Sequence, residues 1–248
     1  MTAKPETDEE MAAARVSGTV TAHNAAIHLA PYDAAWPRQF AIEAANIRAA
    51  LGEGAIVLEH VGSTSITGLC AKPIIDILLA VADSADEASY VPALTPYGYR
   101  LHIREPDWEQ HRVMKHDNPA VNLHVFTTGS VEIARMVGFR DRCRGLPDER
   151  RLYEQTKRAL AARTWRHVQH YANAKSEVVE AIIARALAAS GRGGRPGAGG
   201  DLGEGDAGQG QEPADALQDA ELFAEQEPGE AGGRHWLDQD DQGGGRGA

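Results

Sequence analysis

One stretch of the chain, EHVGSTSITGLCAKPIIDILLAV (residues 59–81), places groups that could bind phosphate and a metal ion between two apolar runs. Asp76 lies inside the run IIDILL, where an unpaired carboxylate would be costly to bury. It therefore requires a partner, which could be a divalent cation, a neighbouring lysine or arginine, or water at a cleft. Lys72, four residues earlier, could give a phosphate a positive charge or could be an ordinary loop lysine.

The residues Gly62, Ser63 and Thr64 form a predicted turn at the end of the first of these apolar runs. Backbone N–H groups and hydroxyls exposed at such a turn hold phosphate oxygens, and glycine lets the backbone approach a ligand closely. Serine and threonine are also favoured at helix N-caps. A phosphate-binding turn and a simple capped turn are therefore both compatible with these residues.

Several histidines fall on or beside predicted strands: His60, His102, His111, His116 and His124. Together with Asp76, some of them could meet around a transition metal, because imidazole is a common ligand of such ions. No close pair has a strong ligand spacing, and a strand histidine is more often a hydrogen-bonded core or edge residue. The metal site and the structural role both stay open.

The order of the predicted elements indicates an α+β fold. Strands are predicted near residues 27–30, 55–61, 73–81, 98–104, 110–116 and 121–128. The continuous apolar character of 73–81 is typical of a central strand covered on both faces. Helices are predicted from Pro37 to Gly52, across 85–94, and through 130–187 as a C-terminal helical segment.

The negative charge is concentrated at the two ends of the chain. Of the formal charge of −11 on 248 residues, residues 191–248 contribute −9 and residues 1–25 contribute −2. We therefore predict a disordered extension at 1–25, a folded domain at 26–190 and a disordered Gly-rich acidic tail at 191–248, because such compositions cannot offset the entropy cost of ordering. The tail could still fold back on the arginine-rich helices.

The composition also narrows the compartment and the partners. Cys70 and Cys143 stand alone without metal-ligand spacing, which favours buried thiols in a reducing compartment. No signal peptide and no apolar run of roughly 20 residues is found, so we predict a cytoplasmic protein without a membrane partner. The balanced charge of residues 26–190 argues against nucleic acid as a partner.

Several blocks resemble the GrpB family in the family's order: LAPYDAAWPRQFAIEA, LEHVGSTSITGLCAKPIIDILLAV, NLHVF, GFRDRCR and the pairs Tyr153/Lys157 and Tyr171/Lys175. The resemblance spans about residues 27–187. It implies a nucleotidyltransferase-like mixed sheet flanked by helices, related to the accessory domain joined to some dephospho-CoA kinases. The chain has no GxxxxGK[ST] motif, so we do not predict dephospho-CoA phosphorylation.

The resemblance implies metal-dependent nucleotidyl or phosphoryl transfer on an unidentified substrate. A nucleotide or another phosphorylated small molecule would place its phosphates at Gly62, Ser63 and Thr64. Lys72 or Arg112 would neutralise the developing charge.

The metal would be Mg²⁺ or Mn²⁺, held by the catalytic Asp76 and by His124. Working nucleotidyltransferases carry a second acid two residues after the first, so that two ions can bridge the phosphates. Here that position is Leu78, and the later strand offers His124, with Asn122 on the same face. Because Mg²⁺ prefers oxygen ligands, the alternative is a non-catalytic module that binds a nucleotide or stabilises a partner protein.

Overall fold

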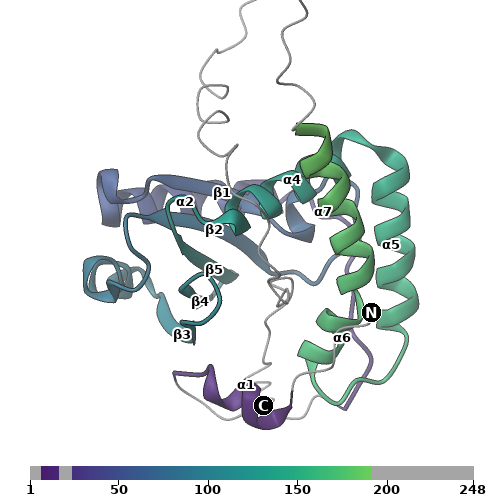
Figure 1. Cartoon of the computed structure of the whole chain (residues 1–248), viewed down its shortest axis with the longest axis horizontal. Helices are drawn as coiled ribbons and strands as arrows, with labels where there is room; N and C mark the ends of the chain where they lie inside the picture. The colour runs from purple at the N-terminus through teal and green to yellow at the C-terminus, as the bar shows by residue number, and fades with distance from the viewer. Residues whose placement is uncertain (1–6, 17–23, 191–248) are drawn as a thin grey trace, which may run out of the picture.

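The computed structural model describes residues 7–16 and 24–190. Five strands form one mixed sheet in the order β1-β2-β5-β4-β3 (Figure 1). Strand β2 runs parallel to β5, and every other neighbouring pair is antiparallel. The strands are β1 (Val57–Val61), β2 (Ile75–Val81), β3 (Arg100–Glu105), β4 (His111–Asp117) and β5 (Ala120–Thr127).

Helices flank this sheet, which confirms the predicted α+β class. They are α1 (Asp8–Ala13), α2 (Trp36–Leu51), α3 (Val91–Leu94), α4 (Val131–Gly145), α5 (Pro147–Ala161), α6 (Val168–Ala174) and α7 (Ser176–Ser190). Short 3₁₀ turns are η1 (Gly52–Gly54), η2 (Ser63–Ser65), η3 (Glu87–Ser89) and η4 (Thr95–Tyr97). Figure 1 shows α5, α6 and α7 gathered at one end of the molecule as the predicted C-terminal helical segment.

Strand β2 lies inside the sheet, between β1 and β5, and every residue of its sequence IDILLAV is buried. Its odd-numbered residues pack with α2 in one hydrophobic core, which also includes Leu123 and Val125 of β5. On the other face, Leu78 and Phe126 pack with residues of α4 and α7. We call these the α2 face and the α4 face of the sheet. Alternation along β2 therefore sends Asp76 to the α4 face.

Two predicted elements differ from the structure. The segment 27–30 forms no strand and contributes an isolated bridge between Ala30 and Ala71. The predicted helix across 85–94 is broken into η3 and α3. Pro92 lies in the first turn of α3, and it cannot donate the backbone hydrogen bond that a longer helix would need there.

Part of the predicted N-terminal extension is ordered against the edge of the sheet. The Arg104 N–H donates to Ala14 O (2.8 Å) and the Val16 N–H donates to His102 O (3.0 Å), so the segment after α1 lies along β3. The prediction of disorder over 1–25 is therefore wrong for residues 7–16. Residues 1–6 and 17–23 and the predicted tail at 191–248 lie outside the described residues.

Candidate functional site

The turn that follows β1 is built from Gly62 and the 3₁₀ turn η2, and we call residues 62–65 the Gly62 turn. All three of its hydroxyls contact other groups. Ser65 Oγ donates to Gly62 O (2.6 Å), Thr64 Oγ1 lies 3.1 Å from His60 Nε2, and Ser63 Oγ lies 3.3 Å from the hydroxyl of Tyr153. In this turn, no side chain caps the N-terminus of η2 by a hydrogen bond. The three hydroxyls therefore do not act as helix caps, as the capped-turn interpretation would require.

Gly62 is required by its contact with Asp76. Its φ is +66°, a conformation that side-chain-bearing residues rarely adopt. A Cβ added to Gly62 would lie 2.2 Å from Asp76 Oδ2 and 2.9 Å from its Cγ. The sequence predicted that this glycine brings backbone close to a ligand, whereas here the close neighbour is the carboxylate itself. The backbone of the turn and the carboxylate thus form one site.

Asp76 faces two polar residues of the neighbouring parallel strand β5. The register pairs Asp76 with Asn122, and Asn122 Nδ2 donates to Asp76 Oδ1 (3.1 Å). The Nε2 atom of His124 lies 3.7 Å from the same oxygen. All three residues are buried, with Asp76 5% exposed and His124 0% exposed. The predicted meeting of Asp76 with His124 is therefore present in the structure.

Two further residues continue this group across the α4 face. His124 Nδ1 lies 3.1 Å from His111 Nε2, and His111 Nδ1 lies 2.8 Å from Glu105 Oε2. We call Asp76, His124, His111 and Glu105 the diagonal row, because they come from β2, β5, β4 and β3 in the order of the sheet. His111 and Glu105 are also buried.

Hydrogen bonds and burial join the members of the diagonal row. Burial lowers the pKa of His111 to about 4, although Glu105 opposes this effect. The Glu105 carboxylate accepts from His111 Nδ1, and His111 Nε2 and His124 Nδ1 face each other. His124 Nε2 faces Asp76 Oδ1. Among the described residues this buried nitrogen has no hydrogen-bond partner.

The side chains around Asp76 differ from the ligand set of a Mg²⁺ enzyme. The position of a second acid is occupied by Leu78, which is fully buried in the core on the α4 face. Within residues 7–16 and 24–190, no group of three or more His, Cys, Asp or Glu side chains could hold a metal ion. The residues present do not fit the two-ion, all-oxygen site of a Mg²⁺ enzyme.

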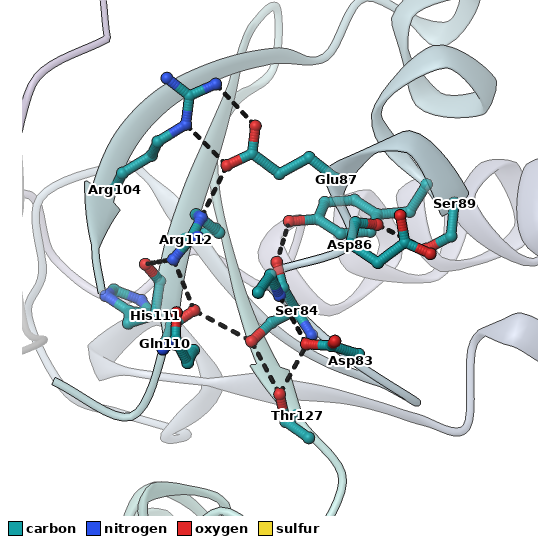
Figure 2. A network of polar contacts seen from close by, with 12 residues as sticks. Asp83, Ser84, Asp86, Glu87, Ser89, Arg104, Gln110, His111, Arg112 and Thr127 are labelled. Atoms are coloured by element: carbon teal, nitrogen blue, oxygen red, sulfur yellow. Dashed lines mark hydrogen bonds and ion pairs between the residues drawn. The ribbon is translucent and has the colours of Figure 1, made fainter. Parts of the chain in front are cut away.

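The structure does not bring Arg112 to this site. Arg112 pairs with Val125 in the sheet register, so its side chain lies on the α2 face, opposite Asp76. Its Nε donates to Glu87 (2.7 Å), and Nη1 donates to the carbonyl oxygens of Gln110 and His111 (Figure 2). Lys72, the other predicted charge donor, is buried in the connection that enters β2.

Helix α5 contributes two groups that we did not assign to the site from sequence. Tyr153 contacts Ser63 from this helix. One turn later, Lys157 Nζ donates to Cys70 O (2.7 Å) and lies 5.2 Å from the centre of the Tyr153 ring. The spacing Tyr-x-x-x-Lys was the available signal, because residues four apart share a helix face. Cys70 and Cys143 are buried free thiols, as predicted.

Two arginines of α4 lie beside the Gly62 turn. Arg144 Nε donates to Ser65 O (3.0 Å), and Arg140 Nη1 donates to His60 O (3.1 Å). Burial, followed by the charges of Arg144 and Arg140, lowers the pKa of His60 to about 3. Arg140 is also paired with Glu59 (2.6 Å) and Asp141 (2.7 Å), and Arg144 lies 3.7 Å from Asp141. Two arginines and two carboxylates therefore lie together beside the turn.

Comparison with known proteins gives consistent matches over this part of the chain. A profile of the family described as "GrpB protein" matches residues 26–185. A UPF0157 protein of Halalkalibacterium halodurans is 55% identical over 184 residues, which cover 74% of this chain and 94% of that protein. A UPF0157 protein of Streptomyces coelicolor is 43% identical over 163 residues, with 66% and 86% covered.

A solved structure has a fold similar to that of this chain. The crystal structure of the conserved protein GrpB from Enterococcus faecalis is 27% identical to this chain, with a TM-score of 0.59. The match covers 65% of this chain and 98% of that protein. Within the described residues, no helix has both the length and the apolar character needed to cross a membrane.

Proposed function

This chain belongs to the GrpB family, and we propose that it binds a nucleotide or another phosphorylated small molecule at the Gly62 turn, with a divalent cation, Mg²⁺ or Mn²⁺, at Asp76. The observation that carries the proposal is the contact between Gly62 and the Asp76 carboxylate. Phosphate and its counter-ion bind side by side, so a site for both needs backbone donors and a carboxylate within a few ångströms of each other.

Hydrogen-bond donors beside the turn support a phosphate-bearing ligand. Arg144 and Arg140 both contact residues of this region, and Ser63 and Tyr153 bring two hydroxyls together at its centre. Hydroxyls both donate and accept hydrogen bonds, so this pair can turn its hydrogens toward a phosphate oxygen. Lys72 supplies a further positive charge in the proposal.

We propose nucleotidyl or phosphoryl transfer as the reaction. The Gly62 turn would hold the phosphates, Asp76 would orient the cation, and Lys72 would neutralise charge that develops as the bond to the leaving group breaks. The bound cation would supply Lewis-acid stabilisation of the phosphoryl oxygens. The acceptor would be a hydroxyl of a second substrate.

A second candidate is a non-catalytic module that binds the same class of ligand or stabilises a partner protein. Leu78 favours it, because a fully buried leucine occupies the position of the second acid. A site with one carboxylate can bind a phosphorylated ligand through one cation without providing the two-ion geometry of transfer.

Thermal-shift screening of nucleotides and sugar phosphates with Mg²⁺ or Mn²⁺ tests the binding proposal. A ligand that binds the folded chain raises the melting temperature according to RT ln(1 + [L]/Kd). We expect cation-dependent stabilisation of the full chain by at least one phosphorylated ligand and its loss in Asp76→Asn. Stabilisation that survives Asp76→Asn, or no stabilisation across the panel, contradicts the proposal.

Product analysis then separates the two candidate functions. The ligand found by the screen is incubated with the protein and a panel of hydroxyl acceptors, and the phosphorus-containing products are resolved. Transfer that is lost in Asp76→Asn supports the enzyme. Tight binding without turnover supports the module.

A further inference from the structure

Two buried pairs of side chains share the spacing Tyr-x-x-x-Lys. They are Tyr153 with Lys157 and Tyr171 with Lys175, and each of the four residues is at most 1% exposed. The lysine ammonium lies over the tyrosine ring in both pairs, 5.2 Å from the ring centre in the first and 4.4 Å in the second. Such contacts between a cation and an aromatic face are favourable. The two pairs therefore have the same internal chemistry, and their surroundings distinguish them.

The first pair is joined to the Gly62 turn. Tyr153 packs in the core on the α4 face together with the residues just before and just after the turn, and its hydroxyl lies 3.3 Å from Ser63 Oγ. Lys157 Nζ donates to Cys70 O (2.7 Å), which lies in the connection from the turn to β2. The pair thus contacts both the turn and the segment that follows it.

The second pair lies in a different core. Tyr171 packs with Ile27, Leu160 and Val168, and its ring centre lies 6.1 Å from that of Trp165. None of these residues belongs to the Gly62 turn or to the connection that enters β2. The second pair therefore serves the packing of α5, α6 and the segment before α2.

We propose that Tyr153 and Lys157 are positioning residues for phosphate binding and that they act through Ser63. Tyr153 donates its hydroxyl hydrogen to Ser63 Oγ, and Ser63 donates its own hydrogen to a phosphate oxygen of the ligand. The inference rests on the proposed function in that the phosphate lies at the Gly62 turn. It adds two residues of α5 and a buried positive charge behind the turn.

The order of burial supports this direction of hydrogen bonding. Ser63 is 7% exposed and keeps some contact with solvent, whereas Tyr153 and Lys157 are covered. A ligand can therefore reach the serine hydroxyl, with the two residues of α5 behind it. The ammonium near the phenol ring stabilises the negative charge that the phenol oxygen gains on donating. Hydrogen bonds in such a chain strengthen one another, and a charged acceptor such as phosphate gains most from them.

Calorimetric titration of the full chain with inorganic pyrophosphate and Mg²⁺ tests the proposal, because this probe carries phosphate groups without a base or sugar. We expect Tyr153→Phe, which removes only the hydroxyl, to weaken pyrophosphate binding by roughly 3- to 10-fold. Lys157→Met should weaken it by about 10-fold or more. Unchanged affinity in either variant, or no binding of pyrophosphate to the parent chain, would overturn the proposal.

The second pair provides the matched control. Tyr171→Phe and Lys175→Met make the same chemical changes at equally buried positions, so they should also lower the melting temperature. They should leave the affinity for pyrophosphate unchanged. An equal loss of affinity in both pairs would mean that the changes act through general destabilisation, and the proposal would fail.

Hydrogen exchange of the unaltered chain keeps the proposal testable if a variant does not fold, and a purely structural role would not affect it. Pyrophosphate should slow the exchange of backbone amides in the Gly62 turn and in α5 around Tyr153, and it should leave α6 around Tyr171 unchanged. No added protection in α5, or equal protection in both helices, would refute the proposal.

The variants also separate this inference from the proposed function. Pyrophosphate binding that is lost in Lys157→Met but survives Asp76→Asn would count against the proposed function only. Binding that is lost in Asp76→Asn but unchanged in Tyr153→Phe and Lys157→Met would count against this inference only.

Discussion

Adjacent residues on β3 and β4 supply two polar networks on opposite faces of the sheet. Arg104 and Arg112 point to the α2 face and meet Glu87, whereas Glu105 and His111 point to the α4 face and belong to the diagonal row. We call Glu87, Arg104 and Arg112 the Glu87 network. It is drawn in Figure 2 with the hydroxyl contacts of Ser84 that support it.

The two networks differ in how their charges are satisfied. In the Glu87 network, Arg104 donates two hydrogen bonds of 2.6 Å to the carboxylate and Arg112 donates one of 2.7 Å. These contacts hold the pKa of Glu87 below its usual range, and the hydrogen bonds from Arg104 make the largest contribution. In the diagonal row, by contrast, the buried Nε2 of His124 has no hydrogen-bond partner among the described residues and lies 3.7 Å from Asp76 Oδ1. Complete pairing is typical of a structural role, and a buried polar atom without a partner indicates a place for a ligand.

The largest effect that we predict comes from Gly62→Ala, which breaks the contact between the turn and the diagonal row. The new Cβ would meet Asp76 at 2.2 Å, and the φ of +66° would be strained. We expect a loss of roughly 3–5 kcal/mol in the free energy of unfolding, measured by urea denaturation. Gly52→Ala is the control, because Gly52 has a φ of +55° and no atom within 4 Å of the added Cβ. It should cost about 1–2 kcal/mol, and equal losses in the two variants would contradict the contact.

Glu87→Ala should break the Glu87 network and leave the diagonal row intact. Arg112, whose side chain is only 7% exposed, would lose its carboxylate partner. We expect a loss of roughly 2–3 kcal/mol by urea denaturation, because a buried charge is left without its counter-charge. Binding of divalent cations should not change. A marked loss of cation affinity would show that the two networks are coupled.

The buried carboxylate of Glu132 on α4 should make the free energy of unfolding depend on pH. Burial raises the pKa of Glu132 from 4.5 to about 7, and the nearby Arg135 only partly opposes this. The folded chain thus holds this proton more tightly than the unfolded chain, so the free energy of unfolding falls as pH rises from 4.5 to 7. Glu132→Gln should therefore stabilise the protein by roughly 1–3 kcal/mol at pH 8 and have little effect near pH 4. Thermal melts across this range check the sign, and a variant less stable than the parent chain at pH 8 would contradict it.

The smallest effect should come from Arg104→Ala. Arg104 shares Glu87 with Arg112, but its side chain is 47% exposed. Exposed ion pairs contribute little, so we expect a loss below about 1 kcal/mol by urea denaturation. A loss as large as that of Glu87→Ala would mean that solvent exposure does not explain the different contributions of the two arginines to stability.

Sequence alone predicted the central part of the site because it lies within single elements. Asp76 follows from one acid in an apolar strand, and Asn122 and His124 share a face of β5 through alternation. Which of the other histidines join Asp76, and that Glu105 joins them, could not be predicted, because this depends on the registers of three strand pairs and on the irregularity between Leu101 and Ile103. A shift of one residue reverses the face.

Two other predictions failed because they depended on strand pairing and chain contacts that the residue pattern does not specify. Arg112 was assigned to the phosphate site from its charge, while its face is set by pairing with Val125. The segment at 27–30 has the composition of a strand, but its backbone bonds to Ala71 and Ala161 and does not join the sheet. The fold class was easier to predict, because apolar periodicity is summed over many residues of each element.

The central claim is that the diagonal row binds a cation and the Glu87 network does not. Crystals of the full chain soaked in Mn²⁺ and measured for anomalous scattering test it most directly. We predict an anomalous peak bonded to both Asp76 Oδ1 and His124 Nε2, and its disappearance in Asp76→Asn crystals. No peak at these atoms, or one beside Glu87 instead, would contradict the account.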